Sequence, residues 1–173
     1  MKDDAKVPMI TSSFRDRESA DRAYAALRKK GYTERDIHVL MSEETRKKLG
    51  GKDVKIEHGN KAAEGAGVGG ALGGAVGATI LGVIAAASTV AIPGIGLVVA
   101  GPLAGALAGG AAGAAAGGLV GTLVGMGIPE DRAKIYEQDL KHGSIVLGVR
   151  PKHAEDADYF ENEWRTTGEH VYR

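Results

Sequence analysis

The chain has 173 residues, 22 basic and 22 acidic side chains, and no cysteine. This length suits one domain, or a small domain with an appendage, and the balanced charge excludes a global electrostatic preference for nucleic acid. The lack of cysteine excludes disulfides, thiolate metal sites and cysteine nucleophiles. The opening MKDDAKVPMI has two early aspartates and no apolar stretch, so we expect no signal peptide and a location in the cytoplasm or at its membrane face.

Strands and one helix are predicted in the first part of the chain. Residues 9–14 (MITSSF) and 36–41 (DIHVLM) predict strands. Between them, apolar residues recur at the i, i+3, i+4, i+7 spacing of an amphipathic helix, which Gly31 is placed to end. These apolar residues are Ala20, Ala23, Tyr24 and Leu27. The polar stretch 42–61 predicts only a short helix and an edge strand at 53–57.

One long segment differs from the rest of the chain. From Gly65 to Pro129 there is no charged residue, no histidine and no aromatic residue, and this run holds 20 of the 27 glycines. All charged and aromatic side chains therefore lie in the two flanks. The two parts of the chain require different surroundings.

The last part of the chain repeats the design of the first. Residues 129–143 (PEDRAKIYEQDLKHG) predict a helix, with proline and acids at its start and Lys141 and His142 at its end. Residues 143–150 (GSIVLGVR) predict a strand, and 169–173 a short one. The helix between them carries its apolar face at Ala157, Phe160 and Trp164 and ends near Gly168.

Neither flank is large enough to fold alone, because two strands and one helix bury too little apolar surface. Together they predict β-α-β-β-α-β, an α+β ferredoxin-like sandwich with two helices on one face of a four-stranded antiparallel sheet. Its halves would be residues 7–60 and 129–173, the second including the bridging helix, and residues 62–128 would be an insertion. Two separate small domains are the alternative.

The glycine-rich stretch EGAGVGGALGGAVGATILG contains the dinucleotide-binding spacing G-x-G-x-x-G at Gly65, Gly67 and Gly70. That motif needs a strand leading directly into it and an acidic residue about 20 positions later. No acid occurs between Glu64 and Glu130, so we reject this interpretation. A solvated linker would not contain so many leucine, valine and isoleucine residues, so we reject a flexible linker too.

A third pattern survives, which we call the glycine ladder: glycines spaced four residues apart. Glycine costs about 1 kcal/mol in a water-exposed helix, so the repeat favours helices whose backbones touch a partner. We predict an antiparallel helical hairpin, residues 62–92 and 95–127, turning at Pro93 and Gly94. The predicted interface comprises Gly65, Gly69, Gly73 and Gly77 in the first helix and Gly101, Gly105, Gly109, Gly113, Gly117, Gly121 and Gly125 in the second.

Each predicted helix would be about 40 Å long and could cross the ~30 Å hydrocarbon layer of a bilayer. Two crossings would leave both flanks on the same side, as one shared sheet requires. Against this, no Trp or Tyr marks the membrane interfaces, and residues 104–118 are almost all glycine and alanine. Burial of the hairpins between subunits of a soluble assembly therefore stays open.

No catalytic, metal-binding or cofactor-binding residue is predicted. The five histidines are scattered, and the best cluster, His153 with three nearby acids, is more typical of a helix start than of a metal site. No serine lies in a nucleophile-elbow motif. The basic stretch 46–48 is balanced by acids, although contact with lipid headgroups is an alternative.

Several motifs resemble a known group of proteins. AIPGIGLVVAGPLAGALAGG, followed by GLVGTLVGMGIPEDRAKIYEQDLKHGSIVLGVR, resembles uncharacterised bacterial membrane and general-stress proteins that join a short α/β domain to a glycine-zipper segment. The similarity runs from about Met9 to Arg150. It implies a role in stress tolerance and association with membrane, with no assigned reaction.

We therefore expect a non-enzymatic, stress-associated protein that forms homo-oligomers through the glycine ladder. It would sit in the cytoplasmic membrane with both termini in the cytoplasm, bind no nucleic acid and need no cofactor. The alternative is a soluble cytoplasmic scaffold (a shell, ring or filament) whose hairpins are buried between subunits. A regulator that binds a small molecule on its sheet is a third possibility, for which no pocket motif is found.

Overall fold

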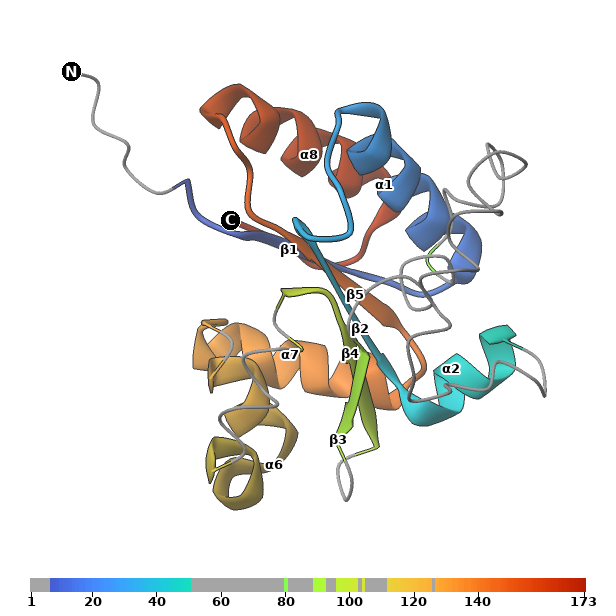
Figure 1. Ribbon diagram of the computed structural model, residues 1–173, viewed down its shortest axis with the longest axis vertical. Coiled ribbons are helices and arrows are strands. Elements are labelled where there is room, and N and C mark those ends of the chain that lie inside the picture. The colour runs from blue at the N-terminus through green and yellow to red at the C-terminus, as the bar shows by residue number, and fades with distance from the viewer. Residues whose placement is uncertain are drawn as a thin grey trace.

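The computed structural model describes residues 7–50, 80, 89–92, 96–102, 104, 112–125 and 127–173, except for the side chains of residues 50, 89–92 and 112–117. Its elements are arranged in three layers, with a sheet between two layers of helices (Figure 1). In chain order they are β1 (Ile10–Phe14), α1 (Arg17–Lys29), β2 (Ile37–Ser42), α2 (Glu43–Gly50), β3 (Thr89–Ile92), β4 (Leu97–Ala100), α6 (Ala112–Gly125), α7 (Glu130–Lys141), β5 (Ile145–Val149), α8 (Ala154–Thr167) and β6 (Val171–Tyr172).

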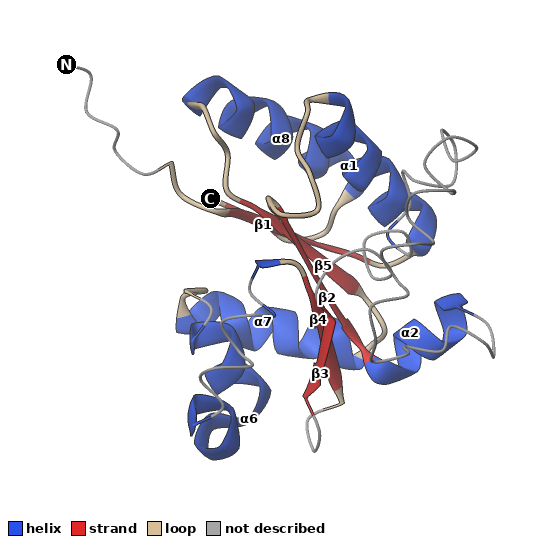
Figure 2. Cartoon of the chain, in the orientation of Figure 1, coloured by secondary structure: helices blue, strands red, loops and turns tan. Residues whose placement is uncertain are grey.

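The sheet joins the two flanks of the chain. Its strand order is β3-β4-β2-β5-β1-β6, and all neighbouring strands are antiparallel. Strand β5, from the last part of the chain, lies between β1 and β2 from the first part (Figure 2). The predicted α+β class is therefore confirmed, and so are the strands expected near residues 9–14, 36–41, 143–150 and 169–173. The alternative of two separate small domains is wrong.

The predicted helical hairpin is wrong at its centre. Residues 89–92 and 97–100 were expected in the helices 62–92 and 95–127, but they form the antiparallel strands β3 and β4. Thr89, Val90 and Ile92 are β-branched, which favours strands, and β4 is a short apolar run buried on both faces. Periodicity cannot distinguish such a run from a buried helix. Pro93 and Gly94, the predicted turn, lie outside the described residues.

Helices α1 and α8 cover one face of the sheet, as their apolar patterns predict. The side chain of Asp16 caps α1 by accepting a hydrogen bond from the Ser19 backbone N–H at 2.8 Å. From α8, Trp164 packs edge-on against Phe14 of β1, with ring centroids 5.9 Å apart. The two helices bury all of their predicted apolar positions: Ala20, Ala23, Tyr24, Leu27, Ala157, Phe160 and Trp164.

The helix predicted to bridge the insertion to β5 covers the other face. This helix, α7, buries Ala133, Tyr136 and Leu140 against the sheet. The Tyr136 hydroxyl donates to Thr11 Oγ1 at 2.8 Å, so the one polar group of this side chain is satisfied within the core. Helix α6 adds Leu119 and Leu123 to the same core.

Gly101 ends β4 in a conformation that glycine alone adopts readily. Its φ is +101°, and a Cβ at this position would collide with the backbone carbonyl oxygen of Ile37. The glycine therefore lets the chain leave β4 in close contact with β2. Gly101 was predicted to be part of the second glycine-ladder helix, and that prediction is wrong because its φ is not helical.

We predict that Gly101→Ala lowers the free energy of unfolding by about 3 kcal/mol, combining the unfavourable φ with overpacking. Gly31→Ala is the matched control, because Gly31 also has a positive φ, +82°, but a Cβ there meets nothing within 4 Å. The control should lower stability by only about 1–2 kcal/mol. Urea denaturation measures both, and equal effects would contradict the role assigned to Gly101.

Candidate functional site

The structure describes five of the eleven predicted glycine-ladder positions. Gly113 and Gly117 lie before the break of α6 at Gly118, Gly121 and Gly125 lie after it, and Gly101 lies in the turn after β4, so the predicted continuous helix is wrong at Gly118 and at Gly101. The other six positions, and the predicted turn, lie outside the described residues: Gly65, Gly69, Gly73, Gly77, Gly105 and Gly109, with Pro93 and Gly94.

Helix α6 turns its leucine row inward and part of its glycine row outward. Leu119 and Leu123 are buried in the core beneath α7, whereas Val124 is 43% exposed and Gly125 lies at the surface. Its backbone is broken at Gly118, where φ is +59° and ψ is −150°, and Thr122 Oγ1 donates to the Gly118 carbonyl at 3.0 Å. No helix among the described residues is long and apolar enough to cross a membrane.

One residue of the first glycine-rich segment is also described, and it contacts the domain directly. The Ile80 side chain is fully buried in the core beneath α1 and α8. Its backbone N–H donates to Asp21 Oδ1 at 2.8 Å, and Asp21 Oδ2 accepts from Arg17 Nε at 3.1 Å. No local sequence pattern indicates this contact, because Asp21 looks like an ordinary solvated residue of an amphipathic helix.

A small pocket lies where α6 and α7 meet the end of the sheet. Its volume of about 250 Å³ is below the range of roughly 300–1,000 Å³ that is usual for ligand pockets. The Glu137 and Lys141 side chains in its wall pair with each other at 3.0 Å. The pocket is lined by Ser42, Gly96, Leu97, Gly118, Leu119, Glu137, Leu140 and Lys141.

Ser13, His170 and Asp139 come together beneath α7 and superficially resemble a hydrolytic triad. His170 Nδ1 lies 2.9 Å from Asp139 Oδ2 and 3.4 Å from Ser13 Oγ, so one ring nitrogen makes both contacts. A triad needs the carboxylate on one ring nitrogen and the nucleophile on the other. Ser13 is also fully buried. The arrangement therefore fastens the C-terminal strand to α7 and cannot activate a nucleophile.

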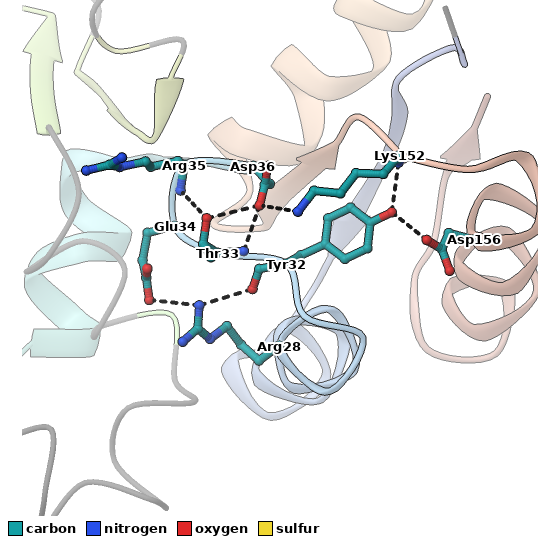
Figure 3. Close-up of polar contacts among 8 residues, drawn as sticks. All are labelled: Arg28, Tyr32, Thr33, Glu34, Arg35, Asp36, Lys152 and Asp156. Carbon is teal, nitrogen blue, oxygen red and sulfur yellow. Dashed lines mark hydrogen bonds and ion pairs between the residues drawn. The ribbon is translucent and has the colours of Figure 1, made fainter. Parts of the chain in front are cut away.

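A polar cluster at one end of the sheet links the loop before β2 to the loop after β5 (Figure 3). The Tyr32 hydroxyl donates to Asp156 Oδ2 at 2.8 Å and accepts from the Lys152 backbone N–H at 2.8 Å. Lys152 Nζ also pairs with Asp36 Oδ2 at 3.1 Å and lies over the Tyr32 ring. Burial raises the pKa of Tyr32 to about 12, so its hydroxyl stays protonated and remains a donor.

Each charged group at the centre of this cluster pairs with another member of the cluster. Burial tends to raise the pKa of Asp36, but hydrogen bonds from Thr33 and Lys152 outweigh it and lower that pKa. Arg28 donates to the Tyr32 carbonyl at 3.0 Å and pairs with Glu34 at 3.2 Å. This geometry ties the two halves of the domain together and leaves no free acid or base for catalysis at its centre.

His38 of β2 is a buried histidine that these contacts do not use. It lies beside Gly148 in the sheet and is 7% exposed, and within the described part of the chain its Nδ1 has no hydrogen-bond partner. Burial lowers its pKa to about 4, with a further contribution from Arg150 and opposition from Asp36. In the described ranges no group of three His, Asp or Glu side chains could hold a metal ion.

Comparisons of the chain with protein-family models, curated proteins and solved structures find no match. The resemblance to bacterial membrane and stress proteins therefore stays a prediction. Of the predicted interface glycines that the structure describes, four lie in α6, on either side of its break at Gly118. The Tyr32 cluster and the Ile80 contact were missed, since both join residues far apart in the sequence.

We predict that His38 makes stability depend on pH between about 6.5 and 4. Its pKa is lower in the folded state, so the unfolded chain binds a proton first as the pH falls. The contribution of His38 to the free energy of unfolding should fall by up to roughly 3 kcal/mol across this range and level off below it. Urea denaturation of wild type and His38→Asn at several pH values isolates the contribution of His38 to the free energy of unfolding. A difference that is independent of pH would contradict the prediction, and His153→Asn, at the surface, is the control.

Tyr32→Phe should lower the free energy of unfolding by about 1–3 kcal/mol, because the Lys152 N–H and the Asp156 carboxylate each lose a partner. Tyr159→Phe is the control, since this ring is 38% exposed and its hydroxyl makes no hydrogen bond within the described residues. We expect the control to lie within about 0.5 kcal/mol of wild type. Thermal and urea denaturation measure both variants.

Proposed function

We propose that this is a non-enzymatic protein that self-associates, its charged α+β domain carrying a Gly/Ala-rich segment that packs against other copies. The observation that carries the proposal is the run of residues 65–129, which has no charged side chain. Both hydrophobic cores of the domain also contain residues from the charged flanks. The outward side of α6 supports it, because Val124 and Gly125 present a small, apolar surface.

We also infer that the domain is ferredoxin-like once α2, β3, β4, α6 and α7 are set aside. The remaining elements in chain order are β1, α1, β2, β5, α8 and β6, and in space their strands follow the order β2-β5-β1-β6. The hairpin β3–β4 then extends this sheet at the β2 edge.

The position of β3 favours self-association over a membrane-spanning hairpin. Residues 65–88 form an uncharged run of 24 residues, long enough for one crossing of about 20 residues but too short for two. A single crossing would separate β3 from β2 across the bilayer, although both strands belong to one sheet. Residues 102–111 would reach only about 15 Å as a helix, half of the hydrocarbon layer.

Attachment to a membrane surface is the second candidate function. The uncharged run favours it, and so does the resemblance to bacterial membrane proteins, which also implies a role in stress tolerance. Flotation of the purified protein with liposomes tests it. Recovery of all the protein in the soluble fraction, without detergent, would contradict membrane attachment and leave self-association untouched.

Sedimentation without detergent tests self-association. We expect wild type to form particles larger than one chain, and Gly125→Leu, at an exposed position with open space around it, to weaken their assembly by about 1–3 kcal/mol per contact through overpacking, while helix content is kept. Asn162→Leu, at an exposed site on α8, adds the same side chain to the opposite layer and should leave assembly unchanged. A monomeric wild type would show that the proposal is wrong, and equal effects of the two variants would remove α6 from the interface.

A further inference from the structure

We call the packing of Ile80 against Asp21 and the core beneath α1 the Ile80 contact. Ile80 belongs to the segment proposed for self-association. Ile80 is eight positions before the end of the uncharged run that precedes β3, with glycines at 65, 69, 73 and 77 before it. Its side chain is fully buried, and its N–H is bound to Asp21. The contact is therefore made by the chain with its own domain.

Asp21 suits this role because one carboxylate serves two partners. Oδ1 accepts from the Ile80 backbone, while Oδ2 is held by Arg17 at 3.1 Å one helical turn earlier. The Asp21 side chain remains 23% exposed, so water can replace Ile80 as the partner of Oδ1. The contact can therefore open without leaving a buried charge unpaired.

We propose that the Ile80 contact is an autoinhibitory contact that limits self-association. A backbone N–H and a side chain engaged with their own domain are not available to another copy, so assembly has to compete with this contact. Opening it makes the Ile80 side chain and backbone N–H available to another copy. This inference rests on the proposed self-association and names its regulation.

A cross-link between Asp21→Cys and Ile80→Cys tests the proposal directly. The protein has no native cysteine, so a disulfide or a short bis-maleimide joins only these two positions within one chain. We expect the linked monomer to associate at least about tenfold more weakly than the same protein unlinked. Equal association of the linked and unlinked forms would overturn the proposal. Each single-cysteine variant, treated in the same way, is the control.

Substitutions at Asp21 test the contact from the other side. Asp21→Ala removes the acceptor and should strengthen association by about tenfold, whereas Asp21→Asn keeps a carbonyl oxygen for Ile80 and should change it less. Asp158→Ala removes an exposed carboxylate from α8 and should have no effect. Weaker association of Asp21→Ala would overturn the proposal, because the site would then hold Ile80 from another copy. Thermal denaturation establishes that each variant is folded.

Elastase digestion separates failure of this inference from failure of the proposed function. Elastase cleaves after small apolar residues, and at concentrations too low for assembly we expect Asp21→Ala to be cut faster than wild type between residues 65 and 88. Faster cleavage with every variant monomeric at all concentrations would mean that the contact restrains the segment but that self-association is wrong. Unchanged cleavage, with an assembling wild type, would overturn the Ile80 contact alone.

Discussion

The insertion of β5 between β1 and β2 is the constraint on which the rest of the structure depends. β5 lies about a hundred residues after β2 in the chain, yet it pairs with β2 over Ile37–Leu40 and with β1 over its whole length. Closing so long a loop costs only slightly more than closing a shorter one, because the entropic cost grows with the logarithm of length. The pairing makes one sheet from the two flanks of the chain.

That constraint divides the intervening chain into parts with different surroundings. β3 and β4 extend the sheet at the β2 edge, and the leucines of α6 complete the core beneath α7. The composition of this chain suggests one long apolar hairpin. Part of it instead belongs to the sheet, part to a helical layer, and part to the segment that we propose for association. Gly101 makes this division possible, because its conformation lets the chain turn sharply after β4.

Polar contacts complete the joining of the two halves at two places. Tyr32 bridges the two halves at one end, and Tyr136 and His170 fasten the last strand beneath α7. Each of these groups is used in holding elements together. This explains why a chain with many ionisable side chains near one another presents no acid, base and nucleophile in a catalytic arrangement among its described residues.

The sequence by itself determined the α+β class, the apolar faces of α1 and α8, and the strands β1, β2 and β5. The helices have the periodicity of one buried face, and the strands are short runs bounded by turn residues. The sequence also separated the uncharged segment from the flanks. The tertiary structure alone decided that residues 89–92 and 97–100 are strands, because a short apolar run fits a buried strand or helix until its neighbours are known. It also decided the contacts of Ile80 with Asp21 and of Tyr32 with Asp156. Such pairs join residues far apart in the chain, and no local pattern encodes them.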